Sequence, residues 1–278
     1  MKIDLQKTDF INVEDVQIPT SFYNRFKTQV SLVDNLFGGA GFLPGTSFAL
    51  AGGPGSGKST FLLQVGGILA LQGKNVAYIS GEESVVQISF NCKRMGIKGV
   101  KVSNMTDCDA ICKQIELNKF DFVVIDSFPT ITAKRANTMK KREEYVIHRL
   151  CSMAKKTDTV IGFIQHVTKQ GNYKGSTLLP HSVDMTIKMS KNEDDPQNLN
   201  ARDFMVTKNR FGANAFISLN LTQHGFDLDR EYKVQDPLDN VKTVSMTDAV
   251  RLFGSYYKAN KSLSTQGFKK NGKQFVRS

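Results

Sequence analysis

Short runs of apolar residues alternate along the chain with segments whose apolar positions recur every three or four residues. The short runs predict β-strands, because four to eight consecutive apolar residues are typical of strands buried on both faces. The predicted strands span residues 47–50, 76–80, 101–103, 122–126, 160–164, 185–189, 204–208 and 216–221. The last two or three follow one another after short connections, so we expect them to be antiparallel additions at one edge of the sheet.

Helices are predicted between the early strands, over residues 59–71, 84–95, 109–118 and 143–155. In the second of these, Val85, Ile88, Cys92 and Met95 fall on one face, and Gly96 ends the helix. Strands that alternate with helices pair in parallel through right-handed crossovers, so the sheet has to be covered on both faces. The predicted fold class is therefore α/β, with a mostly parallel central sheet, helices on both faces and antiparallel edge strands.

Both ends of the chain depart from this pattern. Residues 1–26 form an N-terminal segment, a candidate oligomerisation arm, and residues 27–228 are the predicted core. Residues 229–278 form a basic extension, in which a short helix from about Thr247 precedes a flexible tail. The N-terminus has no apolar signal core and no apolar run is long enough to span a bilayer, so we expect a cytoplasmic protein without a membrane segment.

The composition points to an anionic partner. The chain has 37 Lys and Arg residues against 26 Asp and Glu, which gives a formal net charge of +11. Nucleic acid is the first candidate for such a partner, although a basic surface also serves solubility alone. The four cysteines include no Cys-x-x-Cys pair, so we expect reduced thiols and not a zinc site.

The most specific motif is GGPGSGKST, which follows the apolar residues 48–50 and precedes a helical pattern. Its glycines let backbone N–H groups turn towards phosphate oxygens, while Lys58 reaches the outer phosphates and the Ser59 hydroxyl holds Mg²⁺. This context argues against an incidental glycine-rich turn. The residues assigned to the nucleotide are Gly52, Gly53, Pro54, Gly55, Ser56, Gly57, Lys58, Ser59 and Thr60. The predicted ligands are ATP and Mg²⁺.

Carboxylates at two other strand ends complete the predicted site. Asp126 ends the strand FVVID and is assigned to the metal together with Ser59, although a strand-end Asp can also cap a turn. Glu82 and Glu83 follow the strand that ends at Ser80, at the edge where open α/β sheets bind ligands. We assign Glu82 as the base that polarises water and keep Glu83 as the alternative; both also suit a helix N-terminus.

The motifs GGPGSGKSTFLLQ, YISGEES, FVVIDS, QHVTKQG and KNRFG follow one another within residues 27–222. In this set and order the chain resembles the RadA (Sms) branch of the RecA superfamily of recombination ATPases. The resemblance implies a RecA-like P-loop ATPase core. The zinc module and protease-like domain of that branch have no counterpart in the sequence, so we expect a core like those that some bacteriophages use for recombination or strand annealing.

The resemblance implies further sites beyond the phosphate loop. His166, at the end of an apolar strand, would sense the γ-phosphate with Gln165 beside it, unless it is an ordinary strand-end histidine. Two basic loops would bind single-stranded DNA, with lysines on phosphates and Tyr173 stacked on a base. Their residues are Lys134, Arg135, Lys140, Lys141 and Arg142 in the loop 132–143, and Lys169, Tyr173 and Lys174 in the loop 168–182. The first loop equally suits a solvated charge run that leads into a helix.

Lys208 and Arg210 belong to KNRFG, which we place at a hairpin tip. In the RadA branch this motif acts across a subunit interface, where a cation stabilises charge on the neighbour's γ-phosphate. A solvent-facing turn with a positive φ at Gly212 is the alternative. The resemblance therefore implies a homo-oligomer, a ring or a filament, with ATP between subunits.

The predicted function is an ATP-dependent, single-stranded-DNA-binding recombination protein with DNA-dependent ATPase activity. A single-strand-binding or replication protein is a candidate further partner. A hexameric DnaB-like helicase or branch-migration motor is the first alternative, and a non-catalytic, ATP-binding recombination mediator is the second. A KaiC-like regulatory ATPase is a weaker alternative, because this function gives the basic loops and the basic tail no role.

Overall fold

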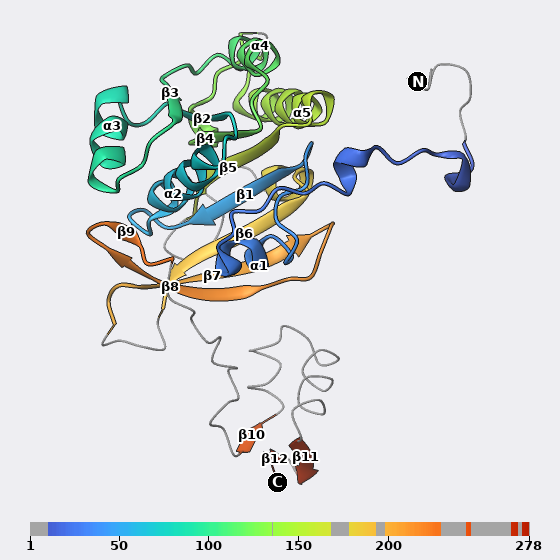
Figure 1. Ribbon diagram of the computed structural model, residues 1–278, viewed down its shortest axis with the longest axis vertical. Coiled ribbons are helices and arrows are strands. Elements are labelled where there is room, and N and C mark those ends of the chain that lie inside the picture. The colour runs from blue at the N-terminus through green and yellow to red at the C-terminus, as the bar shows by residue number, and fades with distance from the viewer. Residues whose placement is uncertain are drawn as a thin grey trace. The chain divides into compact units, whose positions relative to one another are not determined.

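The computed structural model describes residues 11–134, 136–167, 178–192, 198–228, 243–245, 268–271 and 274–277. The chain divides into two units, Met1–Arg230 and Glu231–Ser278. The first unit contains one sheet of nine strands in the order β3-β2-β4-β5-β1-β6-β7-β8-β9 (Figure 1). Its strands are β1 (Ser47–Gly52), β2 (Val76–Ser80), β3 (Val100–Ser103), β4 (Phe122–Asp126), β5 (Val160–His166), β6 (Met185–Lys191), β7 (Ala201–Asn209), β8 (Phe216–Thr222) and β9 (Gly225–Phe226).

Most helices of this unit connect the parallel strands. They are α1 (Ser31–Leu36), α2 (Lys58–Leu71), α3 (Val85–Arg94), α4 (Cys108–Asn118), α5 (Met139–Thr157) and α6 (Leu178–Ser182), with 3-10 turns η1 (Val13–Asp15), η2 (Thr20–Phe22) and η3 (Phe128–Thr130). Strands β1 to β6 pair in parallel, and β7, β8 and β9 extend the sheet as antiparallel strands. The predicted α/β class and the antiparallel edge are confirmed. Among the described residues, no helix has the length and apolar character needed to cross a membrane.

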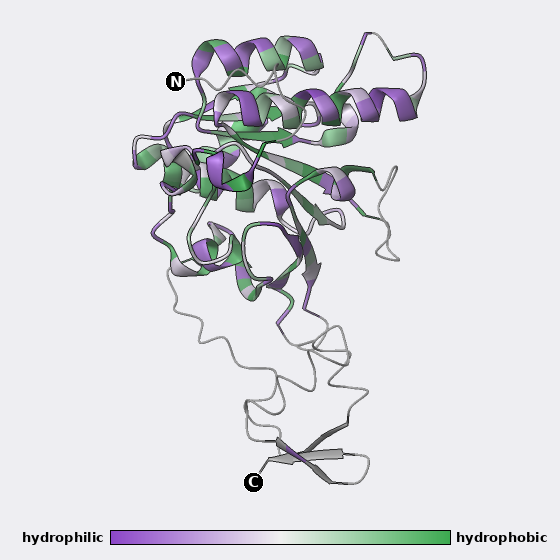
Figure 2. Ribbon diagram, turned by 90° about the vertical axis from the view of Figure 1, so that its right-hand side faces the viewer, coloured by the Kyte–Doolittle hydropathy of each residue, from purple (hydrophilic) through white to green (hydrophobic). Residues whose placement is uncertain are grey.

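Successive side chains of a strand point to opposite faces of the sheet, so alternate positions pack against different helices. On one face, Val123 and Ile125 of β4 and Ile161 of β5 belong to one buried cluster with residues of α4 and α5. On the other face, Val76 of β2 lies against Gly66 of α2, where a Cβ would come within 3.1 Å of the valine. Figure 1 shows α4 and α5 on one side of the parallel strands and α2 on the other. Figure 2 shows that the strands between these layers are predominantly hydrophobic.

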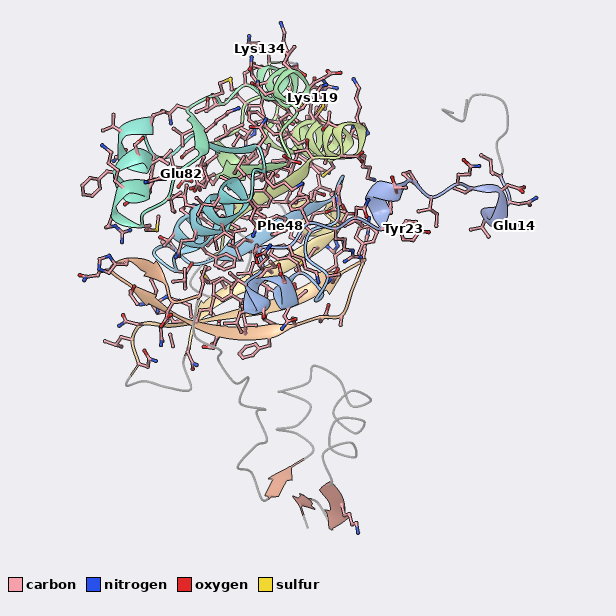
Figure 3. All side chains as sticks on the ribbon, in the orientation of Figure 1. Glu14, Tyr23, Phe48, Glu82, Lys119 and Lys134 are labelled. Carbon is pink, nitrogen blue, oxygen red and sulfur yellow. The ribbon has the colours of Figure 1, made fainter. Side chains whose placement is uncertain are left out.

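The N-terminal arm, residues 11–24, leads into the core at Phe26. Phe26 forms an isolated bridge with Phe42, and their rings stack with centroids 5.5 Å apart. The described side chains of this arm are exposed, with 85% of Val13 and 71% of Tyr23 accessible to solvent. Figure 3 shows Glu14 and Tyr23 on this arm, away from the sheet that contains Phe48.

In the second unit, β10 (Thr243–Ser245), β11 (Phe268–Asn271) and β12 (Gln274–Arg277) form an antiparallel sheet in the order β10-β12-β11. The sequence analysis did not predict these strands, which lie within the basic extension. The sequence does contain a hairpin signal, because an Asn-Gly pair at 271–272 lies between two short segments that contain Phe268 and Phe275. We did not use this hairpin signal, because the high positive charge of the segment favoured the interpretation as a tail. The helix predicted from Thr247 lies outside the described residues.

Candidate active site

Residues 53–57 join the end of β1 to the first turn of α2 at the carboxyl edge of the sheet. Gly55 and Gly57 have φ angles of +68° and +103°, which side chains with a Cβ rarely adopt. A Cβ built on Gly53 or Gly55 meets no atom within 4 Å. The loop therefore has open space beside its backbone, as a cradle for phosphate oxygens requires.

Lys58, the first residue of α2, is buried under this loop with 4% of its surface exposed. Its Nζ donates hydrogen bonds to the carbonyl oxygens of Gly52 at 3.0 Å and Gly53 at 2.8 Å. Burial lowers the pKa of Lys58, while the charges of Asp126 and Glu82 act in the opposite direction. The third acceptor of Lys58 Nζ is the Ser56 hydroxyl at 3.5 Å. A cation held by uncharged loop oxygens is suited to exchange those partners for the stronger charge of a phosphate.

The next residue of α2, Ser59, meets the end of β4. Its hydroxyl donates to Asp126 Oδ2 at 2.8 Å. Asp126 is 3% exposed, and burial raises the pKa of its carboxyl group. The Tyr78 hydroxyl of β2 donates to the same oxygen. Strand pairing of Tyr78 with Val124 explains this contact, because it places Tyr78 one strand away from Asp126 on the face that α2 covers.

Ser59 and Asp126 supply a hydroxyl and a carboxylate, which are the oxygen ligands that Mg²⁺ prefers. No cluster of three or more His, Cys, Asp and Glu side chains that could hold a metal occurs within the described ranges. Mg²⁺ usually keeps several waters and binds one or two carboxylates together with substrate phosphates. The pair therefore fits a Mg²⁺ ion held jointly with a nucleotide. All four cysteines are free.

Glu82 and His166 meet across the carboxyl ends of β2 and β5. His166 Nε2 lies 3.1 Å from Glu82 Oε1 and 3.3 Å from Oε2. The Ser127 hydroxyl also donates to Oε1 of Glu82, whose position is labelled in Figure 3. Strand register brings His166 here, since it pairs with Gly52 at the start of the phosphate loop. The Glu82 side chain is 41% exposed, so its carboxylate combines a fixed orientation with access to solvent.

Glu83 has a different environment. Burial raises the pKa of its carboxyl group, with Asp126 as the next cause. Its Oε2 accepts a 3.4 Å hydrogen bond from Asn91 of α3. Asn104 fixes the loop that carries both glutamates, because its amide donates to the carbonyls of Ser80 at 2.8 Å and Glu83 at 2.6 Å. The geometry thus brings Glu82, rather than Glu83, together with His166.

Three residues that the sequence analysis did not assign to the site support the phosphate loop, two from the antiparallel edge and one from α2. Arg202 of β7 is 7% exposed, and its Nε donates to the Ser56 carbonyl at 3.2 Å. Phe226 of β9 packs so closely on Gly57 that a Cβ there would lie 2.9 Å from the ring. Gln64 of α2 holds Phe226 in place through both of its backbone polar groups, at 3.0 and 2.6 Å. A basic residue amid the apolar positions of β7 was the one sequence signal for this support.

The KNRFG motif lies at the other end of the sheet. Asn209 pairs with Met185, and Met185 pairs with Phe48 near the beginning of β1. Because the phosphate loop follows the opposite end of β1, Lys208 and Arg210 are separated from Lys58 of the same chain by the length of this strand. The alternative turn with a positive φ at Gly212 is not observed, since Gly212 is not among the glycines with that conformation.

Lys208 and Arg210 have different partners at this end. Lys208 Nζ donates to three carbonyl oxygens at the end of α6, those of Pro180 (3.1 Å), His181 (2.9 Å) and Val183 (2.5 Å). Arg210 pairs with Asp184 at 3.3 Å, and its side chain is 51% exposed. Lys208 therefore caps a helix within its own chain, whereas Arg210 presents a cation at the surface.

The residues predicted for DNA are only partly described. Arg135, Lys169, Tyr173 and Lys174 lie outside the described residues. Lys134 is 87% exposed and lies 3.7 Å from Asp107.

The loop predicted over residues 132–143 ends earlier than expected, because α5 begins at Met139 and so contains Lys140, Lys141 and Arg142. Thr138 causes this early start, since its hydroxyl accepts from the Lys141 backbone N–H as an N-cap.

Comparison with protein families and curated proteins identifies relatives of the core. A family model described as an AAA domain matches residues 13–172, more than half of the chain. The DNA repair protein RadA of Listeria monocytogenes is 35% identical over 204 residues, which cover 71% of this chain and 43% of the relative. RadA of Bacillus subtilis is 36% identical over 203 residues, with 70% and 43% covered. The match thus spans less than half the length of these relatives.

Solved structures share the fold at low sequence identity. One solved ATPase domain has a TM-score of 0.65 at 13% identity and covers 73% of this chain and 90% of its own. A KaiC-like protein from Pyrococcus horikoshii OT3 has a TM-score of 0.60 at 18% identity, with 73% and 97% covered. A DnaB-like replicative helicase has a TM-score of 0.62 at 14% identity, with 75% and 61% covered. These likenesses establish the RecA-like ATPase architecture.

Proposed function

Because this chain belongs to the AAA domain family and has a RadA-like core of the RecA superfamily, we propose that it hydrolyses ATP and acts on DNA in recombination or repair. The observation that carries the proposal is the arrangement at the carboxyl edge of the sheet. Lys58 and Ser59 at the start of α2 lie beside Asp126, and Glu82 lies against His166. These side chains come from α2, β4, β5 and the loop after β2, and they provide a cation, a metal-ligating pair and a base.

Each side chain has a proposed role. Lys58 exchanges its carbonyl partners for the outer phosphates, and Ser59 and Asp126 hold Mg²⁺. Mg²⁺, when bound, neutralises charge on the phosphate oxygens. Glu82 orients the attacking water and accepts its proton, which requires a carboxylate open to solvent. His166 holds Glu82 at the edge where nucleotide binding takes place.

We include single-stranded DNA in the proposal as the anionic partner. The net charge of +11 and the exposed Lys134 and Lys140 support it. His166 is followed almost directly by the basic segment 168–177, which supports a path from the γ-phosphate to DNA. Such contacts make DNA affinity fall steeply with salt. The proposed place of action is the cytoplasm.

A homo-oligomer with ATP between its subunits is also part of the proposal. Arg210 lies at the end of the sheet opposite its own phosphate loop, so its guanidinium can reach a γ-phosphate only in a second copy. The N-terminal arm supports the same arrangement, because it exposes large apolar side chains such as Val13. The arm contains Glu14 and Asp15 and no basic residue, so it complements a chain of strongly positive charge.

The decisive test measures ATP hydrolysis of the purified chain with and without single-stranded oligonucleotides, at several salt concentrations. We expect hydrolysis that rises with single-stranded DNA and an assembly visible by electron microscopy with an ATP analogue. A partial-duplex unwinding assay beside a strand-annealing assay separates a recombination protein from a helicase. A monomer that binds ATP but ignores oligonucleotides contradicts the proposal.

Deletion of residues 1–24 tests the arm separately. We expect the deleted chain to bind nucleotide as before and to remain a single subunit in light scattering. Assembly of the shortened chain with unchanged stoichiometry would show that another surface joins the copies.

A further inference from the structure

Tyr78 uses its hydroxyl on the side chain that the proposed site assigns to the metal. The residue lies in the middle of β2 with 2% of its surface exposed. Its hydroxyl donates to Asp126 Oδ2, the oxygen that also accepts from Ser59 at 2.8 Å. Three elements, β2, β4 and α2, are thereby joined through one carboxylate oxygen.

The packing at this position does not require a hydroxyl. Neighbouring strand positions that face the same side carry apolar side chains, such as Val76 in β2 and Val124 in β4. A buried hydroxyl without a partner is costly, so the contact with Asp126 also stabilises Tyr78 in its buried position. The chain thus places a hydrogen-bond donor where a phenylalanine would fill the same space.

The shared oxygen has a consequence for the metal ligands. With Oδ2 fixed by two donors, the carboxylate of Asp126 cannot rotate freely about its last torsion. The Ser59 hydroxyl directs its proton to this oxygen, so its lone pairs remain free for a cation. Mutation of partners that orient metal ligands in this way typically lowers metal affinity about 10- to 100-fold.

We propose that Tyr78 is a positioning residue, which fixes the Asp126 carboxylate and through it the Ser59 hydroxyl in the arrangement that binds the magnesium–nucleotide complex. This inference rests on the proposed function, because it assigns Asp126 and Ser59 to the metal. It extends the site by the first residue of the YISGEES motif, which lies in β2 and to which the sequence analysis assigned no role.

The test replaces only the hydroxyl, in Tyr78→Phe, and measures binding of a fluorescent ADP at increasing Mg²⁺ concentration. We expect the Mg²⁺ concentration for half-maximal binding to rise about 10- to 100-fold. Nucleotide binding in EDTA should stay as in the unchanged protein. The melting temperature in EDTA is measured in parallel, to verify that the variant is folded.

Tyr145→Phe provides a matched control. The Tyr145 hydroxyl also donates to a carboxylate, Asp109 at 2.8 Å, but on α4 and α5, away from the phosphate loop. Its removal should leave the Mg²⁺ dependence unchanged. An Asp126→Asn background supplies the second test, because Tyr78→Phe should then cause no further change in Mg²⁺ dependence.

An unchanged or lower Mg²⁺ requirement in folded Tyr78→Phe would overturn the inference, since it would make the hydroxyl either a packing feature or a competitor for the carboxylate. The same full effect of Tyr78→Phe in the Asp126→Asn background would overturn it as well. Failure of the unchanged protein to bind nucleotide with Mg²⁺ at all would instead refute the proposed function.

Discussion

The Glu82 carboxylate and the His166 imidazole lie in contact, with Nε2 3.1 Å from Oε1, although the two residues are 84 positions apart in the chain. Register explains the contact, because His166 pairs with Gly52 and Ser80 pairs with Asp126 at the same edge of the sheet. The proposed base and a neighbouring histidine therefore meet beside the phosphate loop.

Glu82→Gln should separate hydrolysis from binding. The amide keeps the size of the side chain and a hydrogen-bond acceptor for Ser127, but it cannot take a proton from water. We expect phosphate release to fall at least ~100-fold while nucleotide affinity is nearly unchanged. Glu83→Gln is the matched control and should retain most of the activity. The opposite order in the two variants would assign the base to Glu83.

Arg202→Met tests the support of the phosphate loop. Arg202 donates to the carbonyls of Ser56, Leu199 and Ala201 from a buried position. Removal of these donors leaves buried acceptors without partners, so we expect the free energy of unfolding to fall by about 2–4 kcal/mol and nucleotide to bind more weakly. Urea denaturation and equilibrium binding measure the two effects.

Arg149→Met serves as the control for Arg202→Met. Arg149 forms a partly exposed ion pair with Asp109 at 3.1 Å, and such pairs contribute about 0–1 kcal/mol. An equal decrease in the free energy of unfolding in both variants would show that Arg202 contributes no more than a partly exposed ion pair.

Lys208 and Arg210 should differ in what their replacement changes. Lys208→Ala removes the donor from three carbonyls at the end of α6, so we expect a loss of about 1–3 kcal/mol in the free energy of unfolding. Arg210→Ala should change stability by less than ~1 kcal/mol, because the guanidinium is half exposed. Its effect should instead be a loss of hydrolysis.

Mixing two inactive variants tests whether Arg210 acts between copies. Lys58→Ala lacks the phosphate-loop cation, and Arg210→Ala lacks the surface cation. A mixture contains interfaces at which one copy supplies Lys58 and the other supplies Arg210, so phosphate release should recover in part. No recovery, with mixed assembly verified by light scattering, would place the action of Arg210 within its own chain.

Asp126→Asn should stabilise the protein while it abolishes hydrolysis. Burial raises the pKa of the Asp126 carboxyl group, while the hydrogen bonds from Tyr78 and Ser59 act against this. The folded protein therefore holds this proton more tightly than the unfolded chain does. The carboxylate lowers the free energy of unfolding as the pH rises through the folded-state pKa. The uncharged amide avoids that loss, so we expect a gain of ~1 kcal/mol at pH 7, measured by urea denaturation in EDTA.

The pH dependence provides the control for this prediction. Below the ordinary carboxyl pKa, Asp126 is protonated in both folded and unfolded chains, so the gain from Asp126→Asn should disappear. A gain that persists undiminished at low pH would arise from packing and not from charge.

The sequence predicted most of the parallel sheet, because buried strands such as β2 and β4 consist of continuous apolar runs with clear ends. It also identified Lys58, Ser59 and Asp126, which the structure brings to one edge. It did not reveal Tyr78 or Arg202, because each lies inside a strand where its pattern resembles ordinary core. Their contacts depend on which residues of neighbouring strands lie side by side, and the residues adjacent in the sequence do not indicate this pairing.

The start of α5 is a second feature that the hydrophobic pattern of the sequence did not predict. The apolar pattern begins at Val146, so the charged residues before it resembled a loop. Thr138 nevertheless caps the helix, and the first turn contains Lys140 and Lys141. A polar turn in front of an amphipathic helix is recognised by its cap and not by its hydrophobic periodicity.

The opposite positions of the phosphate loop and Arg210 give each copy two unlike faces. In the proposed oligomer, copies that join through these faces stack head to tail, and every stack has a direction. A closed ring of such copies has as many complete nucleotide sites as subunits, whereas an open filament has one fewer. The two tips of a filament then differ chemically, so growth and shrinkage proceed at unequal rates at its two ends.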